Sequence, residues 1–177
     1  MKFLKIFLIV VAVLIAIILI GGMFLPKTFS VSRSTSIAAS DTVVYKNIAD
    51  FNKFLQWNAW SKMDPKAKVE VSGTPEQVGH KYHWKGDESG EGEMLLSEST
   101  PYSAIKMDMK FIKPWESTSN VGFNLTKEAS GTKVTWTMNG EHNIISKWMC
   151  VFVDMDRMIG KDFDQGLQSL KEMSEKK

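Results

Sequence analysis

The side chains that could do chemistry are few, and their spacing does not bring them together. His80 and His83 are three residues apart in an expected strand, so they point to opposite faces and cannot share a metal ion without a bulge. His142 and Cys150 are isolated in the sequence, and Cys150 at the start of a helix is more typical of a small buried residue than of a nucleophile. We therefore expect neither a metal site nor a nucleophilic cysteine.

Carboxylates offer no better constellation. Asp154, Asp156, Asp162 and Asp164 are the tightest acidic grouping, but helix positions two residues apart diverge by about 200°. They form no facing pair for acid–base work, and a solvated helix face is the simpler interpretation. Ser-x-x-Lys matches occur about as often as chance predicts, and the sequence has no phosphate-binding or dinucleotide-binding fingerprint. We expect no catalytic residue and no cofactor.

The elements that would position these side chains begin with a strand and two short helices. Residues 29–37 alternate between serines and larger side chains, which is the period of a strand. Ser40 is an expected N-cap for a short helix that runs to about Ala49. A second helical turn should cover Phe51 to Leu55.

A meander of about six further strands follows, which makes about seven in all. Apolar and polar residues alternate in all of these strands except residues 94–99, so one face should be dry and the other wet. The expected strands lie at residues 67–72, 81–85, 94–99, 105–111, 121–125 and 134–138. Gly86–Gly90 reads as a hairpin loop, and Glu91 and Glu93 beside it could lie near the mouth of a cavity.

The last segment changes to a helical period. Apolar residues recur at threes and fours, which predicts one long amphipathic helix from Ser146 to Met173. The fold class is therefore α+β, with one antiparallel sheet that must bury a face against this C-terminal helix. A twisted sheet of seven strands would curl around the helix, and the space between them becomes a cavity if side chains leave it open.

The N-terminus carries a separate signal. Ile6 to Leu25 has no charged or strongly polar side chain, and twenty helical residues span about 30 Å, the thickness of a bilayer core. The alternative is a cleaved secretory signal, whose apolar region is usually shorter, about 7–15 residues. We favour a transmembrane anchor over residues 1–26 and a folded domain over residues 28–177. The short basic N-terminus favours a single-pass protein of the cell membrane with this domain outside the cytoplasm.

Composition narrows the partners of this domain. Of the 22 basic residues, Lys2, Lys5 and Lys27 flank the apolar run, which leaves 19 against all 20 acidic residues. A domain this close to neutral lacks the basic surface that nucleic-acid binding needs. Its single cysteine excludes an internal disulfide framework, so its stability must come from packing.

The chain as a whole resembles the START-like, or SRPBCC, helix-grip superfamily, in particular its polyketide cyclase/dehydrase and lipid-transport branch with an N-terminal membrane anchor. The segments that carry the resemblance are Phe24-Leu-Pro26, Val31-Ser-Arg33-Ser with Ile37-Ala-Ala, Asp50-Phe51, Trp57-Asn-Ala-Trp60-Ser, Asp64-Pro65, Val78-Gly79-His-Lys-Tyr82-His-Trp84, Phe111-Ile-Lys113-Pro114-Trp115-Glu116-Ser117, Gly131-Thr132-Lys133-Val134-Thr135-Trp136 and Asp154-Met-Asp156-Arg-Met158-Ile-Gly160-Lys161-Asp162-Phe163. The resemblance implies a helix-grip (START-like/Bet v 1-like) fold. It is specific for fold and not for function, because the superfamily includes carriers, receptors, cyclases and cochaperone-like modules.

By this resemblance, we expect a hydrophobic small molecule or lipid between the sheet and the C-terminal helix. The ligand-binding candidates are the large side chains on faces expected to point inward: Trp57, Trp60, Tyr82, Trp84, Met107, Met109, Phe111, Phe123, Trp136, Met138, Trp148, Phe152 and Met155. The alternative is that they simply fill the core. Trp57 and Trp60, with Trp115, either plug the ends of the sheet or lie at the cavity entrance or membrane interface.

Three functions remain open. The leading hypothesis is non-catalytic binding of a hydrophobic ligand by a membrane-anchored domain. A cyclase- or dehydrase-type enzyme is the second, and it rests on the family resemblance alone. A protein-interaction module of the cochaperone-like kind is the third.

Overall fold

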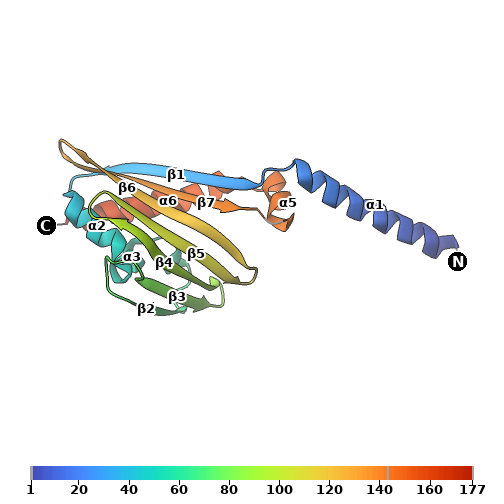
Figure 1. Ribbon diagram of the computed structural model, residues 1–177, viewed down its shortest axis with the longest axis horizontal. Helices are drawn as coiled ribbons and strands as arrows, with labels where there is room; N and C mark the ends of the chain where they lie inside the picture. Colours follow the sequence, from blue (N-terminus) through green and yellow to red (C-terminus); the bar gives the residue numbers. More distant parts are fainter. Residues whose placement is uncertain (1, 143, 177) are drawn as a thin grey trace.

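The computed structural model describes residues 2–142 and 144–176, which form six helices and seven strands (Figure 1). The helices are α1 (Lys2–Phe24), α2 (Asp41–Ala49), α3 (Phe51–Trp57), α4 (Trp60–Met63), α5 (Ile144–Phe152) and α6 (Met155–Glu175). The strands are β1 (Thr28–Ile37), β2 (Lys68–Ser72), β3 (Lys81–Gly86), β4 (Gly90–Thr100), β5 (Ala104–Lys113), β6 (Ser117–Glu128) and β7 (Gly131–Glu141).

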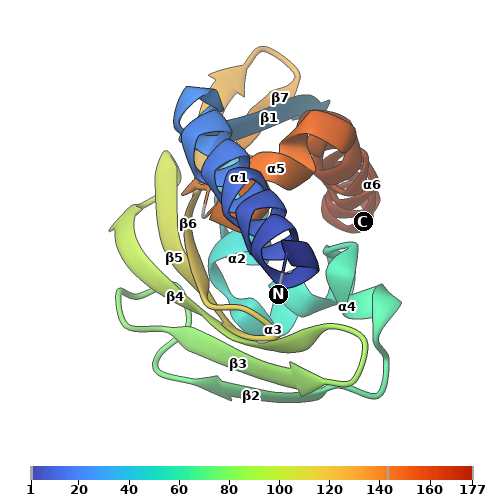
Figure 2. The same cartoon turned by 90° about the vertical axis from the view of Figure 1, so that its right-hand side faces the viewer.

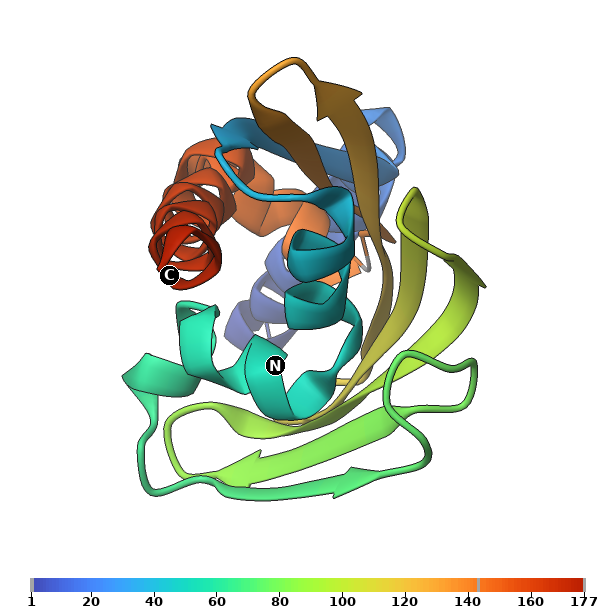
Figure 3. The same ribbon diagram turned by 90° about the vertical axis from the view of Figure 1, so that its left-hand side faces the viewer.

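The seven strands form one antiparallel sheet in the order β1-β7-β6-β5-β4-β3-β2. Strands β2 to β7 pair with their sequence neighbours, and β1 completes the sheet beside β7. The sheet curves strongly, with α2, α3 and α6 on its concave side (Figures 2 and 3). The α+β class, the seven strands and the helix-grip arrangement are confirmed.

Local capping explains where the two short helices begin. The hydroxyl of Ser40 accepts a hydrogen bond from the backbone N–H of Val43, and the carboxylate of Asp50 accepts one from the N–H of Asn52. Both interactions satisfy N–H groups that the first turn of a helix leaves free. The predicted Ser40 cap is therefore confirmed, and the second helix extends two residues beyond the predicted Leu55, to Trp57.

Helix α6 packs chiefly on β1, at one edge of the sheet. The guanidinium of Arg33 on β1 forms ion pairs with Asp156, at 3.0 Å, and with Asp164, at 3.5 Å. Gly160 makes room for this contact, because a Cβ at that position would collide with the guanidinium. Asp156 and Asp164 thus clamp the long helix to the edge strand.

The prediction of one continuous helix from Ser146 to Met173 was wrong. The segment forms two helices, α5 and α6, which are separated by Val153 and Asp154. Asp154 adopts an extended backbone conformation, and its carboxylate accepts a hydrogen bond at 3.0 Å from the N–H of Arg157. An N-cap inside the apolar pattern therefore starts a new helix, and it directs α5 away from the axis of α6.

Helix α1 projects from one end of the domain (Figure 1). In the described part of the chain it is the one helix that is long and apolar enough to cross a membrane, and its apolar stretch is not buried in the domain. A membrane anchor and a signal sequence both have these properties.

Candidate ligand-binding site

The concave face of the sheet brings together methionines from three strands. Met94 on β4 lies opposite Met109 on β5, while Met107 on β5 and Met138 on β7 both lie opposite Val121 on β6. All four methionines are buried. Residues opposite each other in antiparallel strands share a face, so the predicted Met107, Met109 and Met138 belong to one patch. Met94 joins them, although the sequence pattern predicts only that it begins a strand.

Trp136 on β7 is the centre of the aromatic core. Its ring stacks on Phe163 of α6, with centroids 3.9 Å apart and planes 7° from parallel, and on Phe123 at 5.0 Å. Trp57 and Trp60 meet it edge-on, at 5.5 and 5.8 Å. Sheet, gripping helix and short helices therefore all contact this single side chain.

The indole N–H of Trp136 is anomalous. This N–H is buried, and none of the residues that the structure describes accepts a hydrogen bond from it. Four other tryptophans do have one: Trp57 donates to the carbonyl of Asn47, Trp60 to Asp162, Trp84 to the carbonyl of Ser89 and Trp148 to the carbonyl of Ile18. A buried donor without a partner costs about 1–3 kcal/mol, so this position favours an acceptor that the protein does not supply.

A second aromatic group lines the sheet further along. Tyr82 and Trp84 on β3 lie 5.4 Å apart, and Trp84 meets Phe111 of β5 edge-on at 5.6 Å. Burial raises the pKa of the Tyr82 phenol. Tyr82 is the one ionisable side chain among the predicted ligand-binding residues, and at neutral pH it is an uncharged hydrogen-bond donor rather than a base.

The tryptophans that had two interpretations occupy different environments. Trp57 is buried, Trp60 is half-buried against Phe163, and Trp115, in the β5–β6 connection, is 63% exposed. Trp57 and Trp60 belong to the packed interior, and Trp115 lies outside it.

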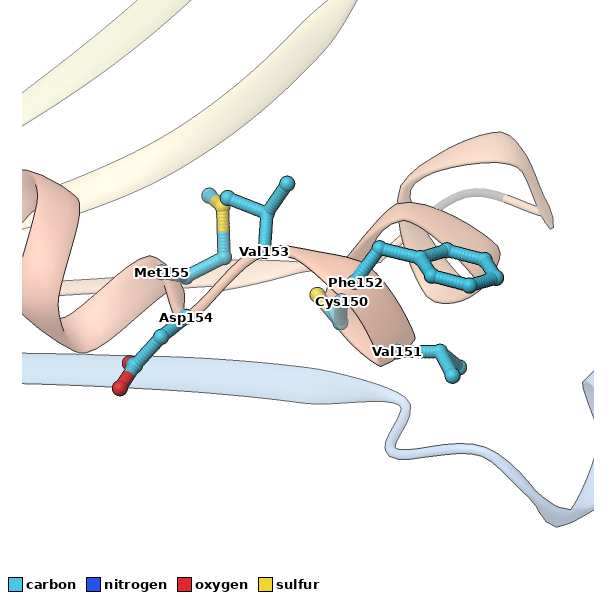
Figure 4. Close-up of a pocket in the computed structure, with 6 residues that line it drawn as sticks. All are labelled: Cys150, Val151, Phe152, Val153, Asp154 and Met155. Atoms are coloured by element: carbon cyan, nitrogen blue, oxygen red, sulfur yellow. The ribbon is translucent and has the colours of Figure 1, made fainter.

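Two pockets stand out on the described residues, and neither lies between the sheet and α6. The first, of about 400 Å³, is lined by residues 150–155 where α5 meets α6 (Figure 4). The second, of about 390 Å³, is lined by residues around the β3–β4 turn: Lys66, Lys68, Lys85, Gly86, Asp87, Gly90, Glu91 and Lys113. Among the described residues, a cluster of buried aromatic and methionine side chains occupies the interior of the grip.

Four lysines and two carboxylates line the second pocket, and one of these carboxylates, Glu91, pairs with two of the lysines. Burial alone would raise the pKa of this carboxyl group, but Lys85 and Lys113, each 3.5 Å away, hold it below its ordinary value. Neighbouring Glu93 has a lowered pKa because Lys81 donates a hydrogen bond to it at 2.7 Å. Both carboxyl groups are therefore ionised partners of lysines, and neither is a proton donor at neutral pH.

Comparison with known proteins assigns the family. The sequence model described as polyketide cyclase / dehydrase and lipid transport matches residues 28–175. The chain belongs to this family. No curated protein matches the sequence significantly.

Solved structures similar to this family member share its fold at low identity. Protein CV1439 from Chromobacterium violaceum is 16% identical, with a TM-score of 0.61 over 86% of this chain and 99% of that one. The Aha1 dimer from Colwellia psychrerythraea is 17% identical, with a TM-score of 0.60 over 83% of this chain and 96% of that one. Ara h 8.0201 is 8% identical, with a TM-score of 0.57 over 83% of this chain and 97% of that one. At these identities the likeness establishes the helix-grip fold alone.

Two predicted residues of this cyclase-family domain, Trp148 and Phe152, lie apart from the aromatic core around Trp136. Trp148 contacts α1, where its ring fills the space beside Gly21. Phe152 is 85% exposed. Met155, the first residue of α6, instead packs against the core. The break at Asp154 is the reason, because it turns α5 away from the face that α6 presents to the sheet. The prediction that Trp148 and Phe152 point inward was therefore wrong.

The structure also brings together two residues that are isolated in the sequence. The sulfur of Cys150 lies 3.2 Å from Nε2 of His142. Burial raises the pKa of the thiol and lowers that of the imidazole. Both groups are therefore uncharged at neutral pH, which is the opposite of an activated thiolate–imidazolium pair. Their spacing of eight residues across a strand–helix connection gave no signal of this contact.

The four clustered aspartates are explained without catalysis. Asp154 caps α6, Asp156 and Asp164 hold Arg33, and Asp162 accepts a hydrogen bond from Nε1 of Trp60 at 3.2 Å. Each therefore fixes the position of the gripping helix.

Proposed function

We propose that this protein binds a hydrophobic small molecule or lipid between the sheet and α6, without covalent chemistry, while α1 anchors it in a membrane. Membership of a family described as polyketide cyclase / dehydrase and lipid transport supports an apolar ligand. The buried, unpaired N–H of Trp136 is the single observation that carries the proposal.

The chemistry of the interior defines the ligand. An apolar body would contact the rings and methionines, and one oxygen acceptor, such as a carbonyl or hydroxyl, would accept the hydrogen bond of Trp136. Because the interior is filled, the ligand must displace side chains. The buried methionines Met94, Met107, Met109 and Met138 suit this role, since an unbranched thioether adapts to irregular shapes at small cost.

The proposal includes no reaction step. Among the ligand-binding candidates Tyr82 alone can ionise, and its raised pKa leaves it protonated at neutral pH. Hydrogen-bond donors and apolar contacts support selection and retention of a ligand, whereas acid–base catalysis needs a group poised near the working pH.

The test is native mass spectrometry of the full chain released from its own membrane, with annular lipid stripped by collisional activation. We expect one retained apolar ligand in the wild-type protein. Trp136→Phe keeps most of the ring and removes the N–H, so it should weaken retention by roughly 2- to 10-fold, the value of one hydrogen bond of about 0.5–1.5 kcal/mol.

Trp115→Phe is the matched control, because Trp115 is exposed in a connection outside the core. It should retain ligand as the wild-type protein does. A protein that carries no ligand from its membrane, or equal retention by the two variants, would contradict the proposal.

A further inference from the structure

We propose that α5 lies in the membrane–water interface, with Met149, Val151 and Phe152 inserted among lipids. This inference rests on the proposed anchoring of α1 in a membrane. It assigns a bilayer surface, rather than a protein, as the partner of the one helix of the domain that contributes no residue to the described core.

Helix α5 has two distinct faces. At about 100° per residue, Met149, Val151 and Phe152 fall on one side of the helix and Cys150 on the opposite side. The three side chains are 48%, 53% and 85% exposed, whereas Cys150 is turned toward His142 of the domain. Figure 4 shows the Phe152 ring pointing away from Met155 and α6. The face that meets solvent is therefore the apolar one.

Contacts with α1 fix the position of α5 along the axis of α1. Nε1 of Trp148 donates a hydrogen bond to the carbonyl of Ile18 at 3.1 Å, and Nζ of Lys147 donates one to the carbonyl of Gly22 at 3.4 Å. The Trp148 ring occupies the space where Gly21 lacks a side chain, since a Cβ there would lie 2.9 Å from it. Helix α5 therefore contacts the C-terminal end of α1, at the end of the domain from which α1 projects (Figures 1 and 2).

The depth of this contact matches an interfacial helix. Ile18 precedes the end of α1 at Phe24 by six residues, which is about 9 Å along a helix. Helices that lie in the plane of the interface bury their apolar face about 5–10 Å into the boundary between headgroups and acyl chains. If α1 spans the bilayer, α5 is held at that boundary. Tryptophan and lysine, which α5 also carries, suit this zone.

Continuity with α1 distinguishes lipid from other occupants. The exposed apolar face of α5 adjoins the exposed apolar end of α1, where Met23 is 74% and Phe24 is 85% exposed. One apolar phase can cover both surfaces. A second copy or another protein would have to cover α5 while lipid covered the helix docked against it.

Because the chain has a single cysteine, replacing it allows a label to be attached at one chosen position. In a Cys150→Ser background, Val151→Cys and Phe152→Cys are each labelled with the environment-sensitive fluorophore NBD. The full chain is then reconstituted into phosphatidylcholine–phosphatidylglycerol vesicles with or without lipids that carry a nitroxide near the headgroup. We expect a blue-shifted emission and a several-fold loss of fluorescence with the nitroxide lipids at both positions.

Two further labelled positions make the result decisive. Val78→Cys is the matched control, because Val78 is 62% exposed in the β2–β3 connection, which is bonded to the end of α2. It should not be quenched. Leu14→Cys, in the middle of α1, reports the anchor itself and should be quenched by nitroxides placed deep in the bilayer.

The outcomes separate this inference from the proposed anchoring. Quenching at Leu14→Cys without quenching in α5 would overturn the inference and leave the anchor intact. No quenching at Leu14→Cys would overturn both. If the emission of the α5 label shifted to the blue as the protein concentration rose, without quenching by nitroxide lipids, the apolar face would contact a second copy of the chain. That result would overturn the inference. Adding Gly21→Leu should displace Trp148 and reduce quenching in α5 alone.

Discussion

Helices α5 and α6 come from one continuous apolar pattern, yet they bury it in different ways. Ile159, Phe163, Leu167 and Leu170 of α6 are buried against the sheet. The apolar residues of α5 include Phe152, which is among the most exposed in the chain. An apolar stripe therefore shows that a helix needs an apolar neighbour, and it does not show whether that neighbour is a protein core or another apolar phase.

The largest test of this difference replaces a phenylalanine in each helix. Phe163→Ala removes a fully buried ring that stacks on Trp136 at 3.9 Å, and should lower the free energy of unfolding by about 3–5 kcal/mol. Phe152→Ala should change it by less than about 0.5 kcal/mol, as expected for an exposed side chain. Urea unfolding of the full chain in detergent, followed by circular dichroism, measures both.

Equal losses for the two variants would contradict the comparison. A large loss for Phe152→Ala would place its ring in the packed domain, and a negligible loss for Phe163→Ala would mean that α6 does not complete the core.

An intermediate effect is expected at the boundary of the two helices. Asp154→Ala removes the N-cap of α6 and should lower the free energy of unfolding by about 1 kcal/mol. Asp154→Asn is the control, because asparagine caps helices as well as aspartate does. If the alanine variant were as stable as the wild-type protein, the two helices would be separated by something other than this cap.

The smallest effect concerns the clamp of α6 on β1, and it depends on pH. The hydrogen bond from Arg33 lowers the pKa of the Asp156 carboxyl group below its ordinary value. A depressed folded-state pKa stabilises the protein above the unfolded pKa, and this contribution disappears as pH falls through the folded value. Asp156→Asn should therefore lose less stability than the wild-type protein between neutral pH and about pH 3, where aspartate titrates.

Asp108→Asn, at an exposed position on β5, is the matched control for this titration. It should follow the wild-type pH profile in the same urea experiment. Coincident profiles for Asp156→Asn and the wild-type protein would show that the clamp does not hold the ionised carboxylate.

Much of the fold could be predicted because it depends on the local periodicity of apolar and polar residues. Alternating residues predicted six of the seven strands, and Ser40 predicted the start of α2. The missed boundary at Asp154 has the same local cause as the correct one at Ser40. An aspartate in an amphipathic pattern reads equally well as a solvated helix residue, so the apolar spacing prevailed in the prediction.

The candidate site was less predictable, because it depends on register and packing. Alternation predicts an inward face for residues that are buried in the structure: Met107, Met109, Phe123, Trp136 and Met138. Their meeting with Phe163 and Met94 depends on which strands pair and where α6 crosses them. The contact of His142 with Cys150 likewise depends on how the chain turns after β7.

By itself, the sequence determined the seven strands, the first two short helices of the domain, its near-neutral charge and the long apolar N-terminal run, since each is a property of neighbouring residues. Only the tertiary structure decided that Trp136 is buried with an unpaired N–H in the described part of the chain, and that α5 docks on α1 with its apolar face outward. The physical reason is that hydrogen-bond satisfaction and burial belong to three-dimensional surroundings. A side chain carries its chemistry with it, but the fold determines what that chemistry meets.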